Sequence, residues 1–353
     1  MGEAKGWKDF VEEFLAQRKW GSGHEIVPLA GDASNRQYFR IRLTGADRPS
    51  IVLMRKNQGE EFKRSEEAVS VHGQGPPGDP FILVARFLKK SGLPVPDLYQ
   101  TREDGSLILQ EDLGDQTLFS RLAVHPEEEE RLTESVLRLL VTLQGLSWSG
   151  EMEWLEDKRY TADLIRWEFE HFLEYGLRSA DPATLAGLRE KIDHESKILA
   201  GSFPSVLVHR DYHSRNLMVR EDGSLGLIDF QDLLLGSPFY DVASFLFDPY
   251  RNLSTEKIER WTRFYCDLAL EKKILPKQTT LDDCLVALFH HAFQRNLKAC
   301  GRFFYIADVK GNPSFLGSVS GTHRNLERLA GKVPELGDFH EQIRPFLRRP
   351  DPL

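Results

Sequence analysis

The sequence has few cysteines and no long apolar run. Its 353 residues include three cysteines, an odd number without the spacing of a metal site: Cys266, Cys284 and Cys300. The N-terminal residues lack the pattern of a secretory leader, so reduced thiols in a cytoplasmic protein are expected. The longest apolar runs, such as residues 81–85, are far too short to cross a bilayer. These features predict a soluble cytoplasmic protein without a membrane partner.

Positive charge is not in excess either. Lysine and arginine together number 46 against 54 aspartate and glutamate residues, which gives a formal net charge of −8. A general nucleic-acid or anionic-membrane partner requires a basic surface, so neither class is expected. With 41% hydrophobic and 28% charged residues, the chain can bury one large core or two moderate ones. We expect a monomer whose partners are small molecules.

One stretch organises the rest of the sequence, and it runs from residue 206 to residue 230. An apolar segment leads into a loop that holds Asp211 and, five residues later, Asn216. A hairpin with a polar turn at residues 221–224 then returns the chain to Asp229, thirteen residues after Asn216. The pattern predicts that two carboxylates and one amide converge at one end of a small hairpin.

This set of side chains is the one that phosphoryl transfer requires. A base must orient the attacking hydroxyl and accept its proton, while hard oxygen ligands hold magnesium against the phosphates. Kinases have the sequence His-Arg-Asp, four residues and Asn, followed later by an Asp that binds the metal. His209, Arg210, Asp211 and Asn216 match that spacing, and Asp229 stands in the later position. The alternative is an ordinary hairpin with an acidic turn, which does not require three polar residues in this register.

Residues 1–112 are predicted to form a small lobe rich in strands. Residues 7–15 have apolar side chains at the spacing of an amphipathic helix, which we interpret as a cover for its own domain rather than a membrane or partner helix. Alternating segments predict five strands, and one apolar segment ended by Ser-Gly-Leu-Pro predicts a helix. The expected strands span residues 24–29, 37–43, 50–56, 97–101 and 106–110, and the helix spans residues 81–90.

Two segments of this lobe are candidates for binding ATP. The turn at residues 31–36, which includes Ser34 and Arg36, is small and polar, so its backbone N–H groups can approach phosphate oxygens. The alternative is a plain hairpin turn, since the Gly-x-Gly-x-x-Gly pattern is absent. The last strand ends beside Glu111 and Leu113, whose backbone groups are available to the edge of the adenine ring.

Residues 113–353 are predicted to form a larger, mostly helical lobe. Two of its helices carry polar clusters that can line a pocket for the acceptor, with Trp167 on one helix and Arg295 and Arg302 on the other. A solvated helix face is the alternative for both clusters. The expected helices span residues 127–146, 161–175, 183–199, 255–270, 280–302 and 318–330, and residues 237–250 include Asp241 before a helical apolar run.

Together the motifs resemble the aminoglycoside phosphotransferase and choline kinase superfamily of small-molecule kinases. The catalytic stretch and the sequence Gly-Ser-Pro-Phe-Tyr-Asp-Val-Ala at residues 236–243 carry that resemblance. Further motifs are similar to one branch, the bacterial kinases that phosphorylate N-acetylmuramate and N-acetylglucosamine at the anomeric hydroxyl. These motifs are Gly-Asp-Ala-Ser at residues 31–34, Tyr-Phe-Arg at 38–40, Asp-Leu-Gly-Asp-Gln-Thr at 112–117 and Gln-Arg-Asn-Leu-Lys at 294–298.

The resemblance implies an α+β, two-lobed, protein-kinase-like fold with a small antiparallel sheet in the first lobe. It also implies that ATP and Mg²⁺ bind in the cleft and that the sugar lies against the helical lobe. By position, the resemblance implies that Asp211 is the catalytic base and contacts the substrate, and that Asn216 and Asp229 are the magnesium ligands. His209 and Asp241 are implied to brace the catalytic loop.

Two residues that a kinase of this architecture uses are missing from their expected positions. The third strand normally carries a lysine that binds the α- and β-phosphates and pairs with a glutamate on the following helix. Met54 stands at the lysine position, and the helix at residues 81–90 has no glutamate. Arg36, Arg40 or Arg55 is therefore expected to supply the positive charge, since a guanidinium is an equally good phosphate partner.

The sequence thus predicts an ATP- and magnesium-dependent kinase for a small hydroxyl acceptor, with an N-acetylated amino sugar favoured. A kinase for an aminoglycoside or a choline-like amine is the first alternative, and it requires an acidic or aromatic acceptor pocket. The second is a nucleotide-binding pseudokinase with little turnover, which the missing lysine favours and the complete Asp211, Asn216 and Asp229 set disfavours. A protein kinase is disfavoured because no Ala-Pro-Glu segment follows Asp229.

Overall fold

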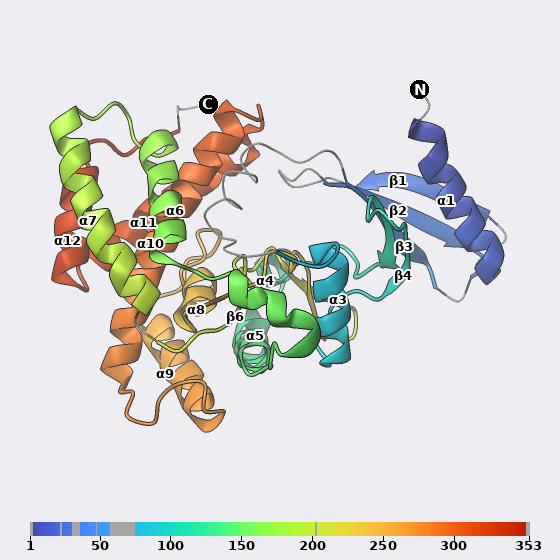
Figure 1. The fold of residues 1–353 in the computed structure, drawn as a ribbon, viewed down its shortest axis with the longest axis horizontal. Helices are drawn as coiled ribbons and strands as arrows, with labels where there is room; N and C mark the ends of the chain where they lie inside the picture. Colours follow the sequence, from blue (N-terminus) through green and yellow to red (C-terminus); the bar gives the residue numbers. More distant parts are fainter. Residues whose placement is uncertain are drawn as a thin grey trace.

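The chain folds into two lobes, one built around a sheet and one mostly helical (Figure 1). The structure is a computed structural model that describes residues 3–21, 23–29, 36–46, 48–56, 75–201 and 203–350. The N-terminus lies beside the sheet, and the long helices gather at the opposite end of the molecule. Helix α3 (Pro80–Lys90) lies between the sheet and the helical lobe.

The sheet has five antiparallel strands in the order β1-β2-β3-β5-β4. The first three strands pair in sequence order, which confirms the predicted meander. The last strand of this sheet in chain order, β5, lies inside the sheet next to β3 and ends where the predicted first lobe ends. The division at residue 112 itself stays a prediction. The strands are β1 (Gly23–Leu29), β2 (Arg36–Thr44), β3 (Ser50–Lys56), β4 (Leu98–Thr101) and β5 (Leu107–Glu111).

Helix α1 (Glu3–Arg18) covers one face of this sheet. Its buried Phe14 belongs to the same apolar cluster as Ile41, Leu53 and Leu109, which come from three different strands. The strand residues alternate with polar positions and the helix residues recur every three or four positions, so each element presents one apolar face. The interpretation of the N-terminal helix as a cover for its own domain is confirmed.

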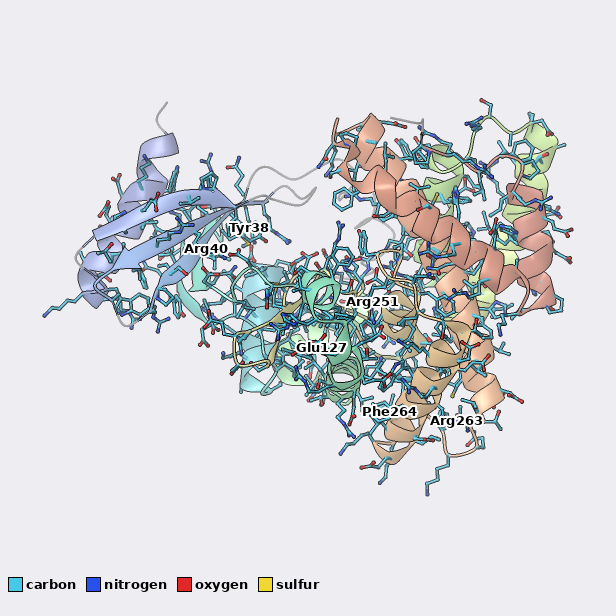
Figure 2. The ribbon with its side chains drawn as sticks, turned by 180° about the vertical axis from the view of Figure 1, so that it is seen from behind. Tyr38, Arg40, Glu127, Arg251, Arg263 and Phe264 are labelled. Atoms are coloured by element: carbon cyan, nitrogen blue, oxygen red, sulfur yellow. The ribbon has the colours of Figure 1, made fainter. Side chains whose placement is uncertain are left out.

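The opposite face of the sheet turns toward the helical lobe. Met54 is fully buried there, in the same apolar cluster as α3. Because side chains alternate along a strand, Arg36 and Arg40 of β2 share this face, whereas Arg55 of β3 lies on the α1 face. Arg40 is labelled on this part of the sheet in Figure 2. The packing of α1 therefore decides which arginines can face the cleft.

The helical lobe follows β5 along the chain, and most of its helices match the predicted segments within a few residues. Two helices were not predicted: α4 has only seven residues, and α12 has a sparse apolar pattern. The earlier elements are α4 (Leu118–Val124), η1 (Pro126–Glu128), α5 (Glu129–Gln144), η2 (Gly150–Asp157), α6 (Ala162–Tyr175) and α7 (Pro182–Gly201). The later elements are α8 (Phe239–Leu246), α9 (Thr255–Glu271), α10 (Leu281–Asp308), η3 (Pro313–Ser318), α11 (Val319–Ala330) and α12 (Pro334–Ile343).

Helix α10 is the central element of this lobe. It is 28 residues long and contacts α6, α8, α9 and α11. Its first turn is fixed by a capping box, in which the side chains of Thr280 and Asp283 each accept a hydrogen bond from the other residue's backbone N–H. Gly301 allows α6 to approach closely, because a Cβ at this position would lie 2.8 Å from the Cα of Phe172. Groups on α6 and α10 are thereby held side by side.

Four short strands position the motif that the sequence singled out. β6 (Val206–Val208) pairs with β9 (Leu234–Gly236), and β7 (Leu217–Val219) pairs with β8 (Leu225–Leu227). The β7–β8 pair is the predicted hairpin, and its turn contains Gly223 at a φ of 78°, a conformation that glycine adopts without strain. The pairing of β9 with β6 was not predicted.

Two further predictions concern the state of the cysteines and the presence of membrane-spanning helices. Cys266, Cys284 and Cys300 are buried free thiols, as predicted. Among the described residues, no helix combines the length and the apolar character that crossing a membrane requires.

Candidate active site

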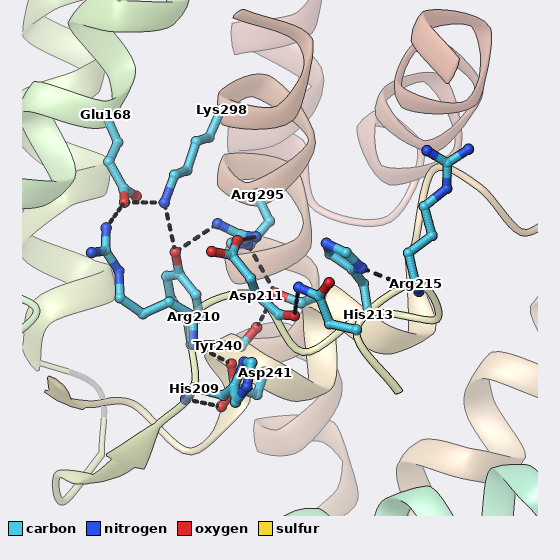
Figure 3. Close-up of polar contacts among 12 residues, drawn as sticks. Glu168, His209, Arg210, Asp211, His213, Arg215, Tyr240, Asp241, Arg295 and Lys298 are labelled. Carbon is cyan, nitrogen blue, oxygen red and sulfur yellow. Dashed lines mark hydrogen bonds and ion pairs between the residues drawn. The ribbon is translucent and has the colours of Figure 1, made fainter. Parts of the chain in front are cut away.

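The catalytic loop, residues 209–216, connects β6 to β7, and Asp229 follows β8 on the way back from the hairpin. The structure brings Asp211, Asn216 and Asp229 together at one cavity of about 220 Å³. Figure 3 shows the loop beneath the side chains of α6 and α10. Asn216 and Asp229 lie at the open end of the hairpin, and a hydrogen bond from Asn216 Nδ2 to the carbonyl oxygen of Asp211 joins the loop to them.

Two residues at this site have a left-handed backbone, Arg210 with a φ of 77° and Asp229 with a φ of 61°. This conformation is unfavourable for a residue with a side chain, and it persists where the surroundings impose it. Asp241 of α8 does so at the loop, because its carboxylate accepts hydrogen bonds from the backbone N–H groups of His209 at 2.6 Å and Arg210 at 3.0 Å. The His209 ring adds a contact of 3.1 Å between Nε2 and the carbonyl oxygen of Ile228. Both implied brace residues thus contact the loop or its neighbouring strand.

Asp211 faces two basic side chains of α10 (Figure 3). One guanidinium nitrogen of Arg295 lies 3.5 Å from Oδ1 of Asp211, and the same group donates to the hydroxyls of Tyr240 at 2.6 Å and Ser244 at 2.9 Å. Burial by itself raises the pKa of Asp211, but the positive charges of Arg295 and Lys298 outweigh it and hold that pKa below its usual range. Asp211 is therefore ionised at neutral pH, which is the form that accepts a proton.

Glu168 of α6 is fully buried beside the catalytic loop. Its carboxylate pairs with Arg210 at 3.0 Å and with Lys298, and it accepts a hydrogen bond from Gln294 at 2.7 Å (Figure 3). Burial raises the pKa of Glu168, but the charges of Lys298 and Arg210 lower it to about 2. In the sequence, Glu168 belongs to the same polar cluster as Trp167, and no contact with the catalytic loop was predicted for it. The missed signal is an acidic residue next to Phe169 on the apolar face of α6.

The side chains of Asn216 and Asp229 fit a magnesium ion that is shared with a nucleotide. Asn216 Nδ2 donates to the carbonyl oxygen of Asp211 at 3.0 Å, which leaves the amide oxygen as a potential ligand. Asp229 Oδ1 accepts from Gln231 Nε2 at 3.0 Å. Within the described ranges, no group of three or more His, Cys, Asp or Glu residues can hold a metal. Two oxygen donors nevertheless suit magnesium, which binds one or two carboxylates and completes its shell with phosphate and water.

The candidate phosphate-binding residues lie in different places. A guanidinium nitrogen of Arg36 lies 3.3 Å from Oδ1 of Asp229, so this arginine reaches from β2 to the candidate metal site. Arg40 is held at the segment that joins the lobes, where its guanidinium donates to Asp112 at 2.6 and 3.0 Å. Ser34 lies outside the described residues. Of Arg36 and Arg40, Arg36 is the one beside the candidate metal site, and phosphate binding stays a prediction for both.

Strand β3 does carry a lysine in an ion pair, two residues beyond the expected position. Met54 is apolar and fully buried. Lys56 shares its face of the strand and pairs with Asp79, the N-cap residue of α3. The lysine and the glutamate that a kinase uses are absent from the two expected positions, since residue 54 is methionine and α3 contains no glutamate. The ion pair of Lys56 with Asp79 lies outside those positions.

The segment after β5 joins the two lobes. The backbone N–H of Glu111 donates to the carbonyl oxygen of Asp97 at 2.8 Å, so this donor already has a partner. The side chain of Leu113 is buried, while its backbone N–H and carbonyl have no hydrogen-bond partner among the described residues. Contact with adenine stays a prediction for both residues, and the backbone groups of Leu113 are the better placed for it.

Comparison with known proteins agrees with this geometry. Residues 25–274 match the model of a family described as the phosphotransferase enzyme family. The chain belongs to this family. A curated protein of Pseudomonas aeruginosa named N-acetylmuramate/N-acetylglucosamine kinase is 32% identical over 349 residues, which cover 96% of this phosphotransferase and 94% of the relative. The resemblance stated from the motifs is confirmed.

Solved structures share the fold of this phosphotransferase. An ethanolamine kinase of Plasmodium vivax matches with a TM-score of 0.60 and 12% identity, over 90% of this chain and 84% of the other. A thermostable mutant of an aminoglycoside phosphotransferase, in a ternary complex with ADP and hygromycin B, matches with a TM-score of 0.54 and 16% identity, over 90% and 97%. The predicted two-lobed, kinase-like fold is confirmed.

The cavity beside Asp211 is the candidate acceptor site of this phosphotransferase, and it is lined by four basic residues. Two of them, Arg295 and Arg302 on α10, were predicted to line it. Lys298 of the same helix and Arg215 of the catalytic loop join them. The cavity therefore has more positive than negative side chains around it, despite the negative charge of the whole chain.

The remaining walls of the cavity are largely apolar and aromatic. Phe247, Tyr250, Phe303 and Phe315 are among the lining residues. Among the described residues, Trp167 is not part of this lining, and its ring stacks instead on that of His171 with 6.1 Å between centroids. The role of Trp167 in binding the acceptor stays a prediction.

Proposed function

We propose that this phosphotransferase transfers the γ-phosphoryl group of ATP to the anomeric hydroxyl of an N-acetylated amino sugar, N-acetylmuramate or N-acetylglucosamine. The relative from Pseudomonas aeruginosa bears the name of that activity and aligns along nearly the whole chain. The relative supports the substrate class, and the arrangement around Asp211 supports the reaction. The predicted monomeric state and cytoplasmic location stay predictions.

In this reaction Asp211 binds the acceptor hydroxyl and accepts its proton. The acceptor oxygen forms a bond to the γ-phosphorus while the bond from that phosphorus to the β–γ bridging oxygen breaks, and ADP leaves. Arg295 keeps Asp211 ionised before the transfer, since a positive charge at 3.5 Å favours the carboxylate. Magnesium, when bound by Asn216 and Asp229, supplies charge neutralisation at the phosphates. Asp241 keeps the loop in the conformation that points Asp211 into the cavity.

The composition of the acceptor cavity is the observation that carries the choice of substrate. Aminoglycosides and choline-like amines are cationic, and a pocket for them requires acidic or aromatic groups facing the cation. The cavity contains aromatic rings, but Arg215, Arg295, Lys298 and Arg302 also line it and repel a cation. A neutral or anionic acceptor suits this cavity better.

An acceptor screen tests the proposal. ADP release is measured with Mg-ATP and N-acetylmuramate, N-acetylglucosamine, several aminoglycosides or choline, and the product is characterised by phosphorus NMR. A glycosyl 1-phosphate is the expected product. Turnover of an aminoglycoside or an amine alone would discard the substrate but retain the mechanism. ATP binding without turnover of any acceptor would favour the pseudokinase alternative.

A further inference from the structure

Arg215 occupies an unusual position in the catalytic loop, directly before Asn216 and four residues after Asp211. Its guanidinium carbon lies 3.8 Å from the centroid of the Tyr250 ring and 5.3 Å from that of Phe119. Both contacts hold the side chain against aromatic surface, as is common for arginine. Arg215 lines the same cavity as Asp211.

Among the residues that the structure describes, no carboxylate pairs with the guanidinium of Arg215. Of the other basic residues that line the cavity, Arg295 pairs with Asp211, and Lys298 pairs with Glu168. Arg215 has no ion-pair partner among the described residues. Figure 3 shows its guanidinium apart from the connected charges of the loop and α10. Stacking on a ring leaves the edge of a guanidinium, which carries its five N–H donors, free to bind an anion.

We propose that Arg215 is a specificity-determining residue that binds the carboxylate of an acidic acceptor sugar. The inference rests on the proposed function and deepens it. N-acetylmuramate carries a lactyl carboxylate, and N-acetylglucosamine has a hydroxyl at the same carbon. A guanidinium held on one face by aromatic rings presents two parallel donors to such a carboxylate. Arg215 thus distinguishes the acidic sugar from the neutral one, whereas Asp211 acts on both.

The alternative residues for this role already have partners. The guanidinium carbon of Arg302 lies 4.9 Å from the centroid of the Tyr305 ring, and this arginine has a further interaction. Arg295 donates to Asp211, Tyr240 and Ser244, so its guanidinium is occupied by the catalytic carboxylate and by α8. The Lys298 ammonium contacts Glu168 and the Tyr240 hydroxyl. Moving either group to a substrate carboxylate breaks contacts near the catalytic loop. Arg215 binds an anion without that loss.

The test is the ratio of kcat/KM values for N-acetylmuramate and N-acetylglucosamine in Arg215→Gln. Loss of a charged hydrogen-bond pair is expected to lower this ratio by about 10- to 100-fold, mainly through KM for N-acetylmuramate. Arg215→Lys keeps the charge but not the paired donors, so its ratio is expected to be intermediate. Calorimetric titration of both sugars provides a readout without turnover.

Arg138→Gln is the matched control, because Arg138 also lies over an aromatic ring, that of Phe264, at 5.2 Å, and is not among the residues that line the cavity. An equal loss for both sugars in Arg215→Gln would overturn the inference and show that Arg215 acts through the loop. An unaltered ratio would also overturn it. Wild-type turnover of N-acetylglucosamine without N-acetylmuramate would overturn the inference alone, and turnover of neither sugar would overturn the proposed function as well.

Discussion

Glu168 and Arg210 form an ion pair of 3.0 Å in which the two side chains are 0% and 5% exposed. The pair joins α6 to the catalytic loop, and Lys298 of α10 binds the same carboxylate. One buried acidic group therefore connects three segments that surround Asp211. Its ionised form depends on the two cations, since an unpaired buried carboxylate is strongly disfavoured.

Glu168→Gln is expected to destabilise the fold by about 3–5 kcal/mol, because it leaves the charges of Arg210 and Lys298 buried without their partner. Urea unfolding followed by circular dichroism measures this change. Glu130→Gln is the control, since Glu130 pairs with Arg260 where both side chains are more than half exposed. Its effect is expected to stay below about 1 kcal/mol. Equal losses of unfolding free energy in the two variants would show that burial does not make the Glu168 ion pair more important for stability than an exposed one.

The acid sensitivity of the fold is expected to depend on Glu168. Its pKa of about 2 in the folded state lies below its value of 4.5 in an unfolded chain. The stability that it contributes is therefore complete above pH 4.5 and is lost as the pH falls toward 2. The difference in unfolding free energy between wild type and Glu168→Gln should shrink steadily as the pH is lowered from 5 to 3. A constant difference over that range would refute this assignment.

Asp211→Asn is expected to lower kcat by about 10²- to 10⁴-fold, because the amide cannot accept the proton of the acceptor hydroxyl. The fold and the affinity for Mg-ATP should be retained, since the carboxylate is not assigned to the metal. Single-turnover kinetics and nucleotide titration separate the two properties. Turnover close to that of wild type would show that another group is the base.

Arg295→Gln is expected to move the acidic limb of the kcat profile to higher pH. The positive charge of Arg295 lowers the pKa of Asp211, so its removal raises that pKa and protonates the base at a less acidic pH. Arg295→Lys retains a charge and serves as the control. The log kcat values are compared from pH 7 down to the lowest pH at which both proteins stay folded, because the acidic limb of the wild type lies below the usual pKa of an aspartate. A limb that does not move in Arg295→Gln would rule out this electrostatic role.

Asp229→Asn is expected to raise the magnesium concentration needed for half-maximal activity by at least about 10-fold. Asparagine tolerates the left-handed conformation found at residue 229, so the effect of the lost charge is measured without new backbone strain. Asp222→Asn in the turn of the same hairpin is the control. If Asp229→Asn reaches half-maximal activity at the same magnesium concentration as Asp222→Asn and wild type, Asp229 is not a metal ligand.

The catalytic motif was readable from the sequence because its geometry is local. Asp211, Asn216 and Asp229 lie within one loop and one hairpin, and short connections leave few ways to arrange them. The strands of the first lobe were predicted for a similar reason, since apolar and polar residues alternate over a few consecutive positions of each strand. The ion pair of Lys56 with Asp79 was not predicted, because Asp79 lies before the helix at residues 81–90 and only the fold brings it to Lys56.

The sequence by itself therefore determined the family, the five strands of the first lobe, and the proximity of Asp211, Asn216 and Asp229. Only the tertiary structure decided that Arg36 shares the cleft face with Met54 and that Arg55 does not, because the packing of α1 selects the covered face of the sheet. It also decided the environment of the base. Glu168 meets Arg210 across 42 residues of sequence and Lys298 across 130, and contacts of that range leave no periodic signal in a chain.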